Sequence, residues 1–507
     1  MISKYKIEFD RLQMLVIAIG CIISIYSFYF FMSNKIYLIG SDVYYYMSIA
    51  DSIVENGEIQ DITRIPSRPV KTPQNGIAFV HVIFSFLGIG ARERIVTIVV
   101  LNYLLYLSGI YPLYKIAKLS KLRKGLPLAA LLSVYLSAWH IYRINLLAIN
   151  DGIFNSAMLW LVFLINNFIY LNKNSGLKIF SHINLIQFLG IIGIVMVAVH
   201  FRLNVILIIG SAVLSLIIIK EYKFASIFGS VCVLLAISFI AIYAFIEVSR
   251  FHGFNQKYLY PLFTSINIYN VKLQLWKILP RLTAGLSGLT SPILTMIFMI
   301  YPLSMIYFGW SGIKEKNFNK IFITTICFTG LWFTLTFQNA RFIWYLFPFI
   351  YLIVLNIKII KLIGYAFCLL VVFQSIQQFY IGFERPPSSN LFLYIYEENI
   401  NLPNEDDLLV SLNERHPYIL LNTRTYDTTV DKNTGEIIFT KELQWPLIES
   451  KGFIYLLGDR TYIDRAFIKI SKMAKSNKYK VIINKLTPEL NRFKGWALVE
   501  IELIEFS

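Results

Sequence analysis

Apolar residues occur along this chain in long runs that are separated by short polar connections. The runs cover residues 13–32, 95–114, 125–141, 152–171, 184–199, 203–219, 224–246, 291–309, 321–337, 342–357 and 362–382. A helix needs roughly 20 apolar residues to cross a bilayer. The pattern therefore predicts about eleven membrane spans, with residues 76–90 as an additional or re-entrant segment.

After residue 382 the pattern changes to short β-rich runs and charged helical stretches. It predicts strands from Val410 onward and over residues 418–421, 453–457 and 479–483, and a helix over residues 461–475. The glycines of this part are scattered, so it carries no Gly-rich phosphate loop. We predict an α-helical polytopic membrane domain over residues 1–382, followed by a soluble α/β domain over residues 383–507.

Composition and charge agree with this architecture and predict its orientation. Hydrophobic residues make up 56% of the chain and charged residues 15%, which excludes an ordinary soluble enzyme. Residues 383–507 hold 16 basic and 18 acidic side chains, so the net charge of +17 belongs to the membrane part. We expect no nucleic acid partner. The connections with the most Lys and Arg are 115–124, 173–178, 220–223, 314–320 and 358–361.

These basic connections belong in the cytoplasm according to the positive-inside rule, together with the N-terminus. An odd number of spans then places the C-terminal domain on the extracytoplasmic side. We expect an integral protein of a bacterial inner (plasma) membrane, in contact with membrane lipids.

Polar residues at the outward ends of spans are the candidates for chemistry. Asp42 directly follows the first apolar run, in a part of the chain with few carboxylates. An amphipathic interfacial helix is expected after it, with Tyr45 and Ile49 on one stripe, Asp51 on another, and an end at Asn56-Gly57. The other outward candidates are Arg143, Asp151, Arg202 and Arg341, and in a long aromatic and basic loop over 248–290, His252, Lys277 and Arg281.

Several short motifs resemble those of GT-C glycosyltransferases, which are polytopic enzymes that use polyprenyl-phosphate-linked sugars. The segment Asp42–Gly57 is similar to the first outward loop of oligosaccharyltransferases, and Thr72-Pro73-Gln74-Asn75-Gly76 fits the entry to the next apolar run. Residues 143–151 (RINLLAIND) and 341–348 (RFIWYLFP) resemble elements of protein mannosyltransferases and aminoarabinose transferases. Two departures are Val43 in place of a second acid and the lack of a Trp-Trp-Asp element in residues 383–507.

The resemblance implies a role for each candidate residue. Asp42 is the expected general base, since an acceptor hydroxyl loses its proton as it attacks the anomeric carbon. Cations stabilise the departing polyprenyl phosphate, and the expected donors are Lys71, Arg143, Arg202, His252, Lys277, Arg281 and Arg341. Tyr44 and Tyr45 suit stacking on a sugar ring. Asp151 orients the acceptor or Arg143, or shares a divalent cation (Mg or Mn) with Asp42. The expected acceptor is an envelope glycan, lipid or protein.

Other readings of the same residues stay open. Asp151 at the start of a span also suits helix capping, and Arg202 and Arg341 suit snorkelling to the interface. The segment Arg92-Glu93-Arg94 is interpreted as an exposed charge cluster. The alternative functions are a polymerase, ligase or oligosaccharyltransferase acting on lipid-linked glycans, and a lipid-linked sugar transporter or flippase. Transport is disfavoured because the charges gather at one face and no internal repeat is evident.

Overall fold

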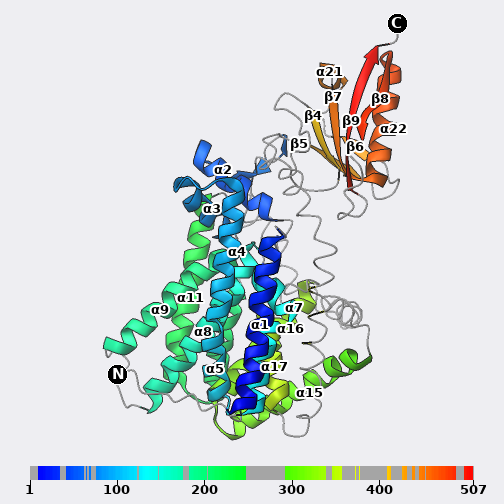
Figure 1. Cartoon of the computed structure of the whole chain (residues 1–507). Helices are drawn as coiled ribbons and strands as arrows, with labels where there is room; N and C mark the ends of the chain where they lie inside the picture. Colours follow the sequence, from blue (N-terminus) through cyan, green and yellow to red (C-terminus); the bar gives the residue numbers. More distant parts are fainter. Residues whose placement is uncertain are drawn as a thin grey trace. The chain divides into compact units, whose positions relative to one another are not determined.

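The computed structural model describes part of the chain in two compact units. The described residues are 10–34, 42–61, 64–65, 68–69, 76–122, 125–146, 148–174, 182–202, 204–246, 292–337, 345–356, 372, 376, 379, 408–412, 425–430, 437–439, 445–450, 453–486 and 496–505. The first unit comprises residues 1–34, 71–76 and 100–380, and the second comprises 35–70, 77–99 and 381–507. Figure 1 shows the elements with the labels used below.

The first unit is helical throughout the residues described. Its helices are α1 (Arg11–Ser33), the second half of α4 (Ala91–Ser108), α5 (Ile110–Leu119), α6 (Leu126–Ser137), α7 (Trp139–Leu146), α8 (Asn150–Asn174), α9 (His182–Phe201), α10 (Asn204–Ile218), α11 (Tyr222–Ile246), α15 (Pro292–Lys314), α16 (Phe318–Phe337) and α17 (Phe347–Asn356). Each predicted apolar run coincides with helix, except 362–382, which lies largely outside the described residues.

Length and apolarity single out three of the described helical segments as able to cross a membrane, namely Arg11–Ser33, Ala91–Leu119 and Asn150–Asn172. Their lengths supply the roughly 30 Å that a bilayer core requires. These are the candidates among the described residues, so the number of about eleven spans stays a prediction. Helix α1 begins with a capping box, in which the side chain of Asp10 accepts a hydrogen bond from the backbone N–H of Gln13.

Helix α1 packs closely on α6 because Gly20 has no side chain. A Cβ at Gly20 would lie 2.8 Å from the Cα of Ser133, which is shorter than a van der Waals contact. Small residues at such positions let membrane helices approach one another backbone to backbone. One turn further along α1, the Ser24 hydroxyl lies 3.3 Å from the Tyr103 hydroxyl of α4, which ties a third helix to this pair.

Replacing Gly20 with Ala is expected to destabilise the protein by about 1–3 kcal/mol, because the added methyl group forces α1 away from the backbone of α6. Thermal unfolding of the purified protein measures the effect. Gly190→Ala is the matched control, since a Cβ there meets nothing within 4 Å. Equal melting temperatures for the two variants would show that the α1–α6 contact is not tight.

A polar cluster joins three helix ends of the first unit. Asn319 at the start of α16 donates hydrogen bonds to the Ile116 carbonyl of α5, at 2.9 Å, and to the Ser120 hydroxyl, at 2.5 Å. Asn356 at the end of α17 donates to the Ser120 carbonyl, at 3.0 Å. These helix ends lie in or next to the basic connections 115–124, 314–320 and 358–361, which the charge pattern places on one side of the membrane. The structure thus brings together helix ends that the sequence groups by charge alone.

Glu315 completes this cluster with two cations, at 2.8 Å from Lys121 and 2.8 Å from Lys320. Partial burial raises the pKa of Glu315, but the hydrogen bonds from Lys121 and Lys320 outweigh it, so the pKa lies below the ordinary value. A carboxylate with a lowered pKa in the folded state stabilises the protein above its unfolded pKa and loses that effect in acid.

We therefore expect Glu315→Gln to lower the melting temperature at pH 7. The difference from wild type should shrink as the pH falls below about 4.5, the range in which a free glutamate takes up its proton. Thermal unfolding at several pH values, with both proteins measured in parallel, tests this expectation. A difference that stays constant down to pH 3 would show that the charge of Glu315 does not contribute.

The second unit combines segments that are distant in sequence. It contains α2 (Val43–Asn56), β1 (Gln60–Asp61), β2 (Arg64–Ile65), β3 (Arg68–Pro69), nearly all of α3 (Gly76–Phe86), the start of α4, β4 (Leu408–Leu412), β5 (Thr425–Val430), β6 (Ile437–Phe439), α21 (Trp445–Ser450), β7 (Phe453–Asp459), α22 (Arg460–Ser476), β8 (Tyr479–Leu486) and β9 (Trp496–Glu505). The predicted strands at 453 and 479 and the predicted helix over 461–475 are confirmed by β7, β8 and α22. The predicted strand over 418–421 lies outside the described residues.

Seven of the described strands form one mixed sheet, in the order β2-β5-β4-β7-β9-β8 with β6 against β5. β5, β4 and β7 run parallel, and β9 runs antiparallel to both β7 and β8. Ile463, Ala466 and Ile470 recur on one face of α22 and are buried with Ile454 and Leu456 of β7. This spacing of three and four residues is the helical period that makes α22 amphipathic. Figure 1 shows α22 beside the strands of this sheet.

β2 belongs to the first predicted outward loop, yet it extends the C-terminal sheet. Arg64 and Ile65 pair in parallel with Thr425 and Tyr426 of β5. Backbone pairing of this kind needs no distinctive side chains, so the sequence pattern did not predict it. The loop after α2 is thereby joined to the C-terminal sheet within the second unit.

Candidate functional site

Asp42 immediately precedes α2. The helix runs from Val43 to Asn56 and is capped by Gly57, whose φ of +70° is the left-handed conformation that a glycine adopts without strain. The predicted end at Asn56-Gly57 is confirmed. Asp42 occupies the N-cap position and is half-buried, but its side chain makes no capping hydrogen bond to α2, whose residues are all described. The carboxylate is therefore not used for the commonest structural role of an aspartate at this position.

Helix α2 is buried on more sides than an amphipathic interfacial helix would be. Tyr44 is 1% exposed, and Met47 and Ile49 are fully buried. Tyr45 is half-buried and meets Tyr46 edge to face, with ring centroids 5.3 Å apart. Tyr44 is thus a core residue of the structure described, and Tyr45 is the more accessible of the two tyrosines that we expect to contact a sugar.

Asp151 forms an ion pair with Arg202 in the first unit. Asp151 lies in the first turn of α8, and Arg202 directly follows the last residue of α9, Phe201. A guanidinium Nη2 of Arg202 donates to the Asp151 carboxylate, and the two side chains are only 16% and 5% exposed. Arg202 therefore points into the protein to meet a buried acid, and snorkelling to the interface does not account for its conformation.

A side-chain hydrogen bond links α7 to α8, the helix that carries Asp151. Asn145 of α7 donates from its side chain to the Ile141 carbonyl at 2.7 Å and accepts a hydrogen bond from the Ser156 hydroxyl of α8 at 3.1 Å. These contacts hold the turn between α7 and α8. Arg143 lies in α7, seven residues before the start of α8. It is exposed, and it takes no part in the Asp151–Arg202 pair.

The other predicted site residues are distributed as follows. Asp42, Tyr44 and Tyr45 belong to the second unit, and Arg143, Asp151 and Arg202 belong to the first. The remaining predictions lie outside the described residues, namely Lys71, His252, Lys277, Arg281 and Arg341. Among the described residues, no group of three His, Cys, Asp or Glu side chains could hold a metal ion.

One charged residue was misinterpreted from the sequence. Arg94, taken with Arg92 and Glu93 as an exposed charge cluster, is 5% exposed, and its Nη1 lies 2.8 Å from the Asp51 carboxylate of α2. Three consecutive charges usually indicate a solvated surface, so the local pattern favoured exposure. Asp51 was a weak signal of a buried ion pair, because it is an acid in a largely apolar helix. The sequence pattern did not indicate which residue would be its partner.

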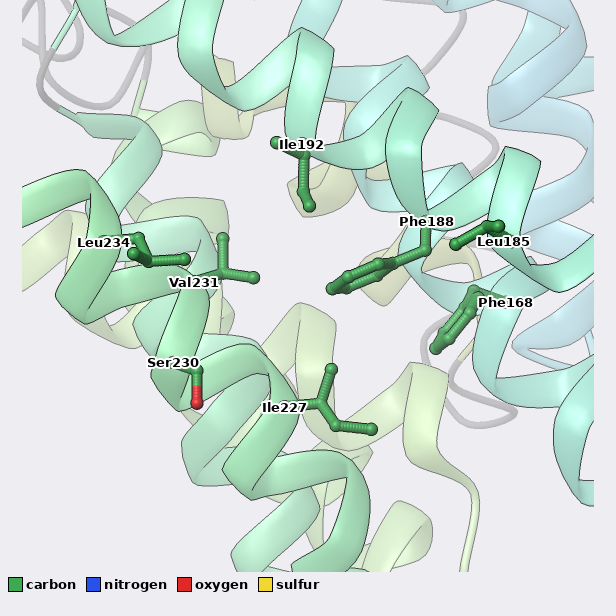
Figure 2. Close-up of a pocket in the computed structure, with 8 residues that line it drawn as sticks. All are labelled: Phe168, Leu185, Phe188, Ile192, Ile227, Ser230, Val231 and Leu234. Carbon is green, nitrogen blue, oxygen red and sulfur yellow. The ribbon is translucent and has the colours of Figure 1, made fainter. Parts of the chain in front are cut away.

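A cavity of about 250 Å³ lies elsewhere in the first unit, between α8, α9 and α11 (Figure 2). It is lined by Phe168, Leu185, Phe188, Ile192, Ile227, Ser230, Val231 and Leu234. The Ser230 hydroxyl donates to the Ser226 carbonyl of its own helix, at 3.0 Å, so the lining offers little to a polar ligand. None of the predicted catalytic or phosphate-binding residues is part of this lining, and we do not assign sugar chemistry to it.

Comparisons with known proteins found no matching family model and no matching curated protein. The structure is similar to the oligosaccharyltransferase AglB from Archaeoglobus fulgidus in complex with an inhibitory peptide and a dolichol-phosphate. The TM-score is 0.47 at 10% identity, over 92% of this chain and 71% of that chain. The Archaeoglobus fulgidus oligosaccharyltransferase in complex with Zn and sulfate has a TM-score of 0.49 at 12% identity, over 90% and 69%.

A third similar structure is ArnT from Cupriavidus metallidurans bound to undecaprenyl phosphate, with a TM-score of 0.45 at 11% identity. It covers 96% of this chain and 97% of that chain. TM-scores below 0.5 leave the activity to be argued from the residues of this chain.

Proposed function

We propose that this chain is an integral-membrane glycosyltransferase. It moves a sugar from a polyprenyl-phosphate-linked donor to a hydroxyl of an envelope glycan, lipid or protein on the extracytoplasmic face. The observation that carries the proposal is the state of Asp42: a half-buried carboxylate at the start of a buried helix that it does not cap. The motifs shared with GT-C glycosyltransferases support the same assignment.

The proposed reaction inverts the anomeric carbon in one displacement. The acceptor oxygen forms a bond to the anomeric carbon while Asp42 takes the hydroxyl proton. The bond between that carbon and the phosphate oxygen breaks, and its electron pair leaves with the polyprenyl phosphate.

Cations are needed where the phosphate gains negative charge. Arg143 is our choice among the described residues, because it is exposed, whereas the charge of Arg202 is already balanced by Asp151. Lys71, His252, Lys277, Arg281 and Arg341 remain proposed phosphate ligands. Asp151 fits a role in orienting Arg202. Its engaged carboxylate does not fit a Mg or Mn site, which normally takes more oxygen ligands, and the mechanism has no step through a metal.

The proposal is tested with the purified protein and short-chain polyprenyl-phosphate sugars, following release of free polyprenyl phosphate and the anomeric configuration of the product. We expect release that depends on an added acceptor, with inversion. Retention of configuration would contradict a direct displacement. Without release from any donor, the same protein reconstituted in liposomes would be assayed for movement of labelled lipid-linked sugar, and such movement would favour the flippase.

A further inference from the structure

The second unit contains a buried ion pair between two helices that the proposed reaction does not use. The Asp51 side chain of α2 is 18% exposed and that of Arg94, in the first turn of α4, is 6% exposed. Breaking such a pair leaves one charge buried without compensation, which is far more costly than losing a surface pair. The pair therefore joins α2 to the start of α4 strongly, although the two residues are separated by 43 positions in the sequence.

The polar surroundings of this pair are not fully satisfied. His81 of α3 is completely buried and close enough to Arg94 to be affected by its charge, and both imidazole nitrogens are without a hydrogen-bond partner among the described residues. The Nε atom of Arg94 and the hydroxyl of Ser52, next to Asp51, are also unpaired within the same described part of the chain. Buried polar groups without a hydrogen-bond partner cost free energy of folding. Apolar side chains at these positions would hold α2 without that cost.

Helix geometry relates the ion pair to Asp42. Nine residues separate Asp42 from Asp51, which corresponds to about 14 Å along the axis and about two and a half turns. The two positions therefore lie on opposite sides of α2. Tyr44 and Met47, seven and four residues before Asp51, share its side of the helix and are buried.

The ion pair thus anchors α2 on the side opposite to Asp42. Apolar contacts tolerate sliding and rotation of a helix, whereas a charged hydrogen bond between two specific atoms holds one rotation.

We propose that the buried Asp51–Arg94 ion pair is a positioning element for the transferase, which fixes the rotation of α2 and thereby the direction of the Asp42 carboxylate. The inference rests on the proposed function, because it assigns the pair to the placement of the general base. Asp51 and Arg94 are positioning residues and contact no substrate in this proposal.

The test compares Asp51→Asn with wild type in two independent measurements on the full chain. Hydrogen exchange of the α2 amides reports the anchoring and needs no turnover. The donor KM and the kcat of polyprenyl-phosphate release report the positioning. We expect faster exchange within α2, a kcat lowered about 10- to 100-fold, and a donor KM within about threefold of wild type, since a misdirected base affects the transition state rather than donor binding.

Three further variants make the result specific. Glu55→Gln removes an exposed acid one turn further along the same helix and is expected to match wild type in both measurements. Arg94→Lys keeps a positive charge beside Asp51. It is expected to retain most of the wild-type exchange protection of α2 and most of the wild-type kcat. The double variant Asp51→Leu, Arg94→Met removes both charges at similar volume, so it is expected to fold and still to show a low kcat.

The outcomes separate this inference from the proposed function. A kcat within twofold of wild type for Asp51→Asn or for the double variant would overturn the positioning role, as would unchanged exchange within α2. A general rise in exchange over both units would assign the pair to stability alone and would also overturn it. The base assignment is decided separately, by the activity of Asp42→Asn with an intact Asp51–Arg94 pair.

Discussion

Asp42→Asn is expected to reduce kcat for polyprenyl-phosphate release by about 10²- to 10⁴-fold, the usual contribution of a positioned general base. Asparagine has nearly the same shape as aspartate but cannot accept the proton of the acceptor hydroxyl. Because the shape of the side chain is retained, the substitution should leave the folded structure and the affinity for the donor largely intact. Steady-state kinetics, donor binding and thermal unfolding on the same preparations measure the three quantities.

Glu58→Gln serves as the control for this experiment, since Glu58 is an exposed acid just after α2 and has no proposed role in the chemistry. Asp42→Glu adds a second comparison, because it retains the carboxylate and displaces it by one methylene group. We expect activity between those of wild type and Asp42→Asn. Full activity of Asp42→Asn would exclude Asp42 as the base, whatever the donor proves to be.

Arg202→Gln is expected to destabilise the first unit by about 3–5 kcal/mol, because it leaves the Asp151 carboxylate buried without its partner. Asp151→Asn should have a comparable effect by leaving Arg202 unpaired. The double variant Asp151→Asn, Arg202→Gln should be less destabilised than the sum of the single variants, since neither charge then remains buried. Chemical or thermal unfolding of the four proteins completes a double-mutant cycle.

Arg143→Gln provides the stability control for this cycle, since it removes an exposed arginine from the neighbouring helix α7 and should change the free energy of unfolding by no more than about 0.5 kcal/mol. The cycle also distinguishes the two interpretations of Arg202. Independent, small effects of Asp151→Asn and Arg202→Gln would favour a snorkelling arginine and a capping aspartate. Strong coupling would establish the ion pair as a structural element of the first unit.

Local pattern was sufficient to predict many individual elements of this protein. The helix α1, the end of α2 at Gly57, and the amphipathic helix α22 all follow from short-range signals: a long apolar run, a glycine that adopts φ > 0, and apolar residues spaced three and four apart. The charge pattern also grouped three basic connections on one side, and the structure joins them through Ser120, Asn319 and Asn356. These properties are encoded within windows of 10 to 20 residues.

The pairings between distant segments could not be predicted in the same way. Arg94 was interpreted as exposed because its two neighbours are charged, and its burial depends on Asp51, 43 residues earlier. Arg202 was a plausible snorkelling residue until the structure placed it on Asp151, 51 residues away. The addition of β2 to the C-terminal sheet joins residues 64–65 to 425–426 through backbone hydrogen bonds that carry no side-chain signature.

The sequence by itself determined that this protein is a polytopic membrane protein, where most of its described helices lie, and which carboxylate at a span end merits attention. Apolar run length and residue spacing are sufficient for these conclusions, since bilayer thickness and helical period are fixed quantities. Only the tertiary structure decided which charges are buried and which acid pairs with which arginine. A buried ion pair is stable only when both partners leave water together, so its existence depends on the packing of whole helices rather than on either residue's neighbours.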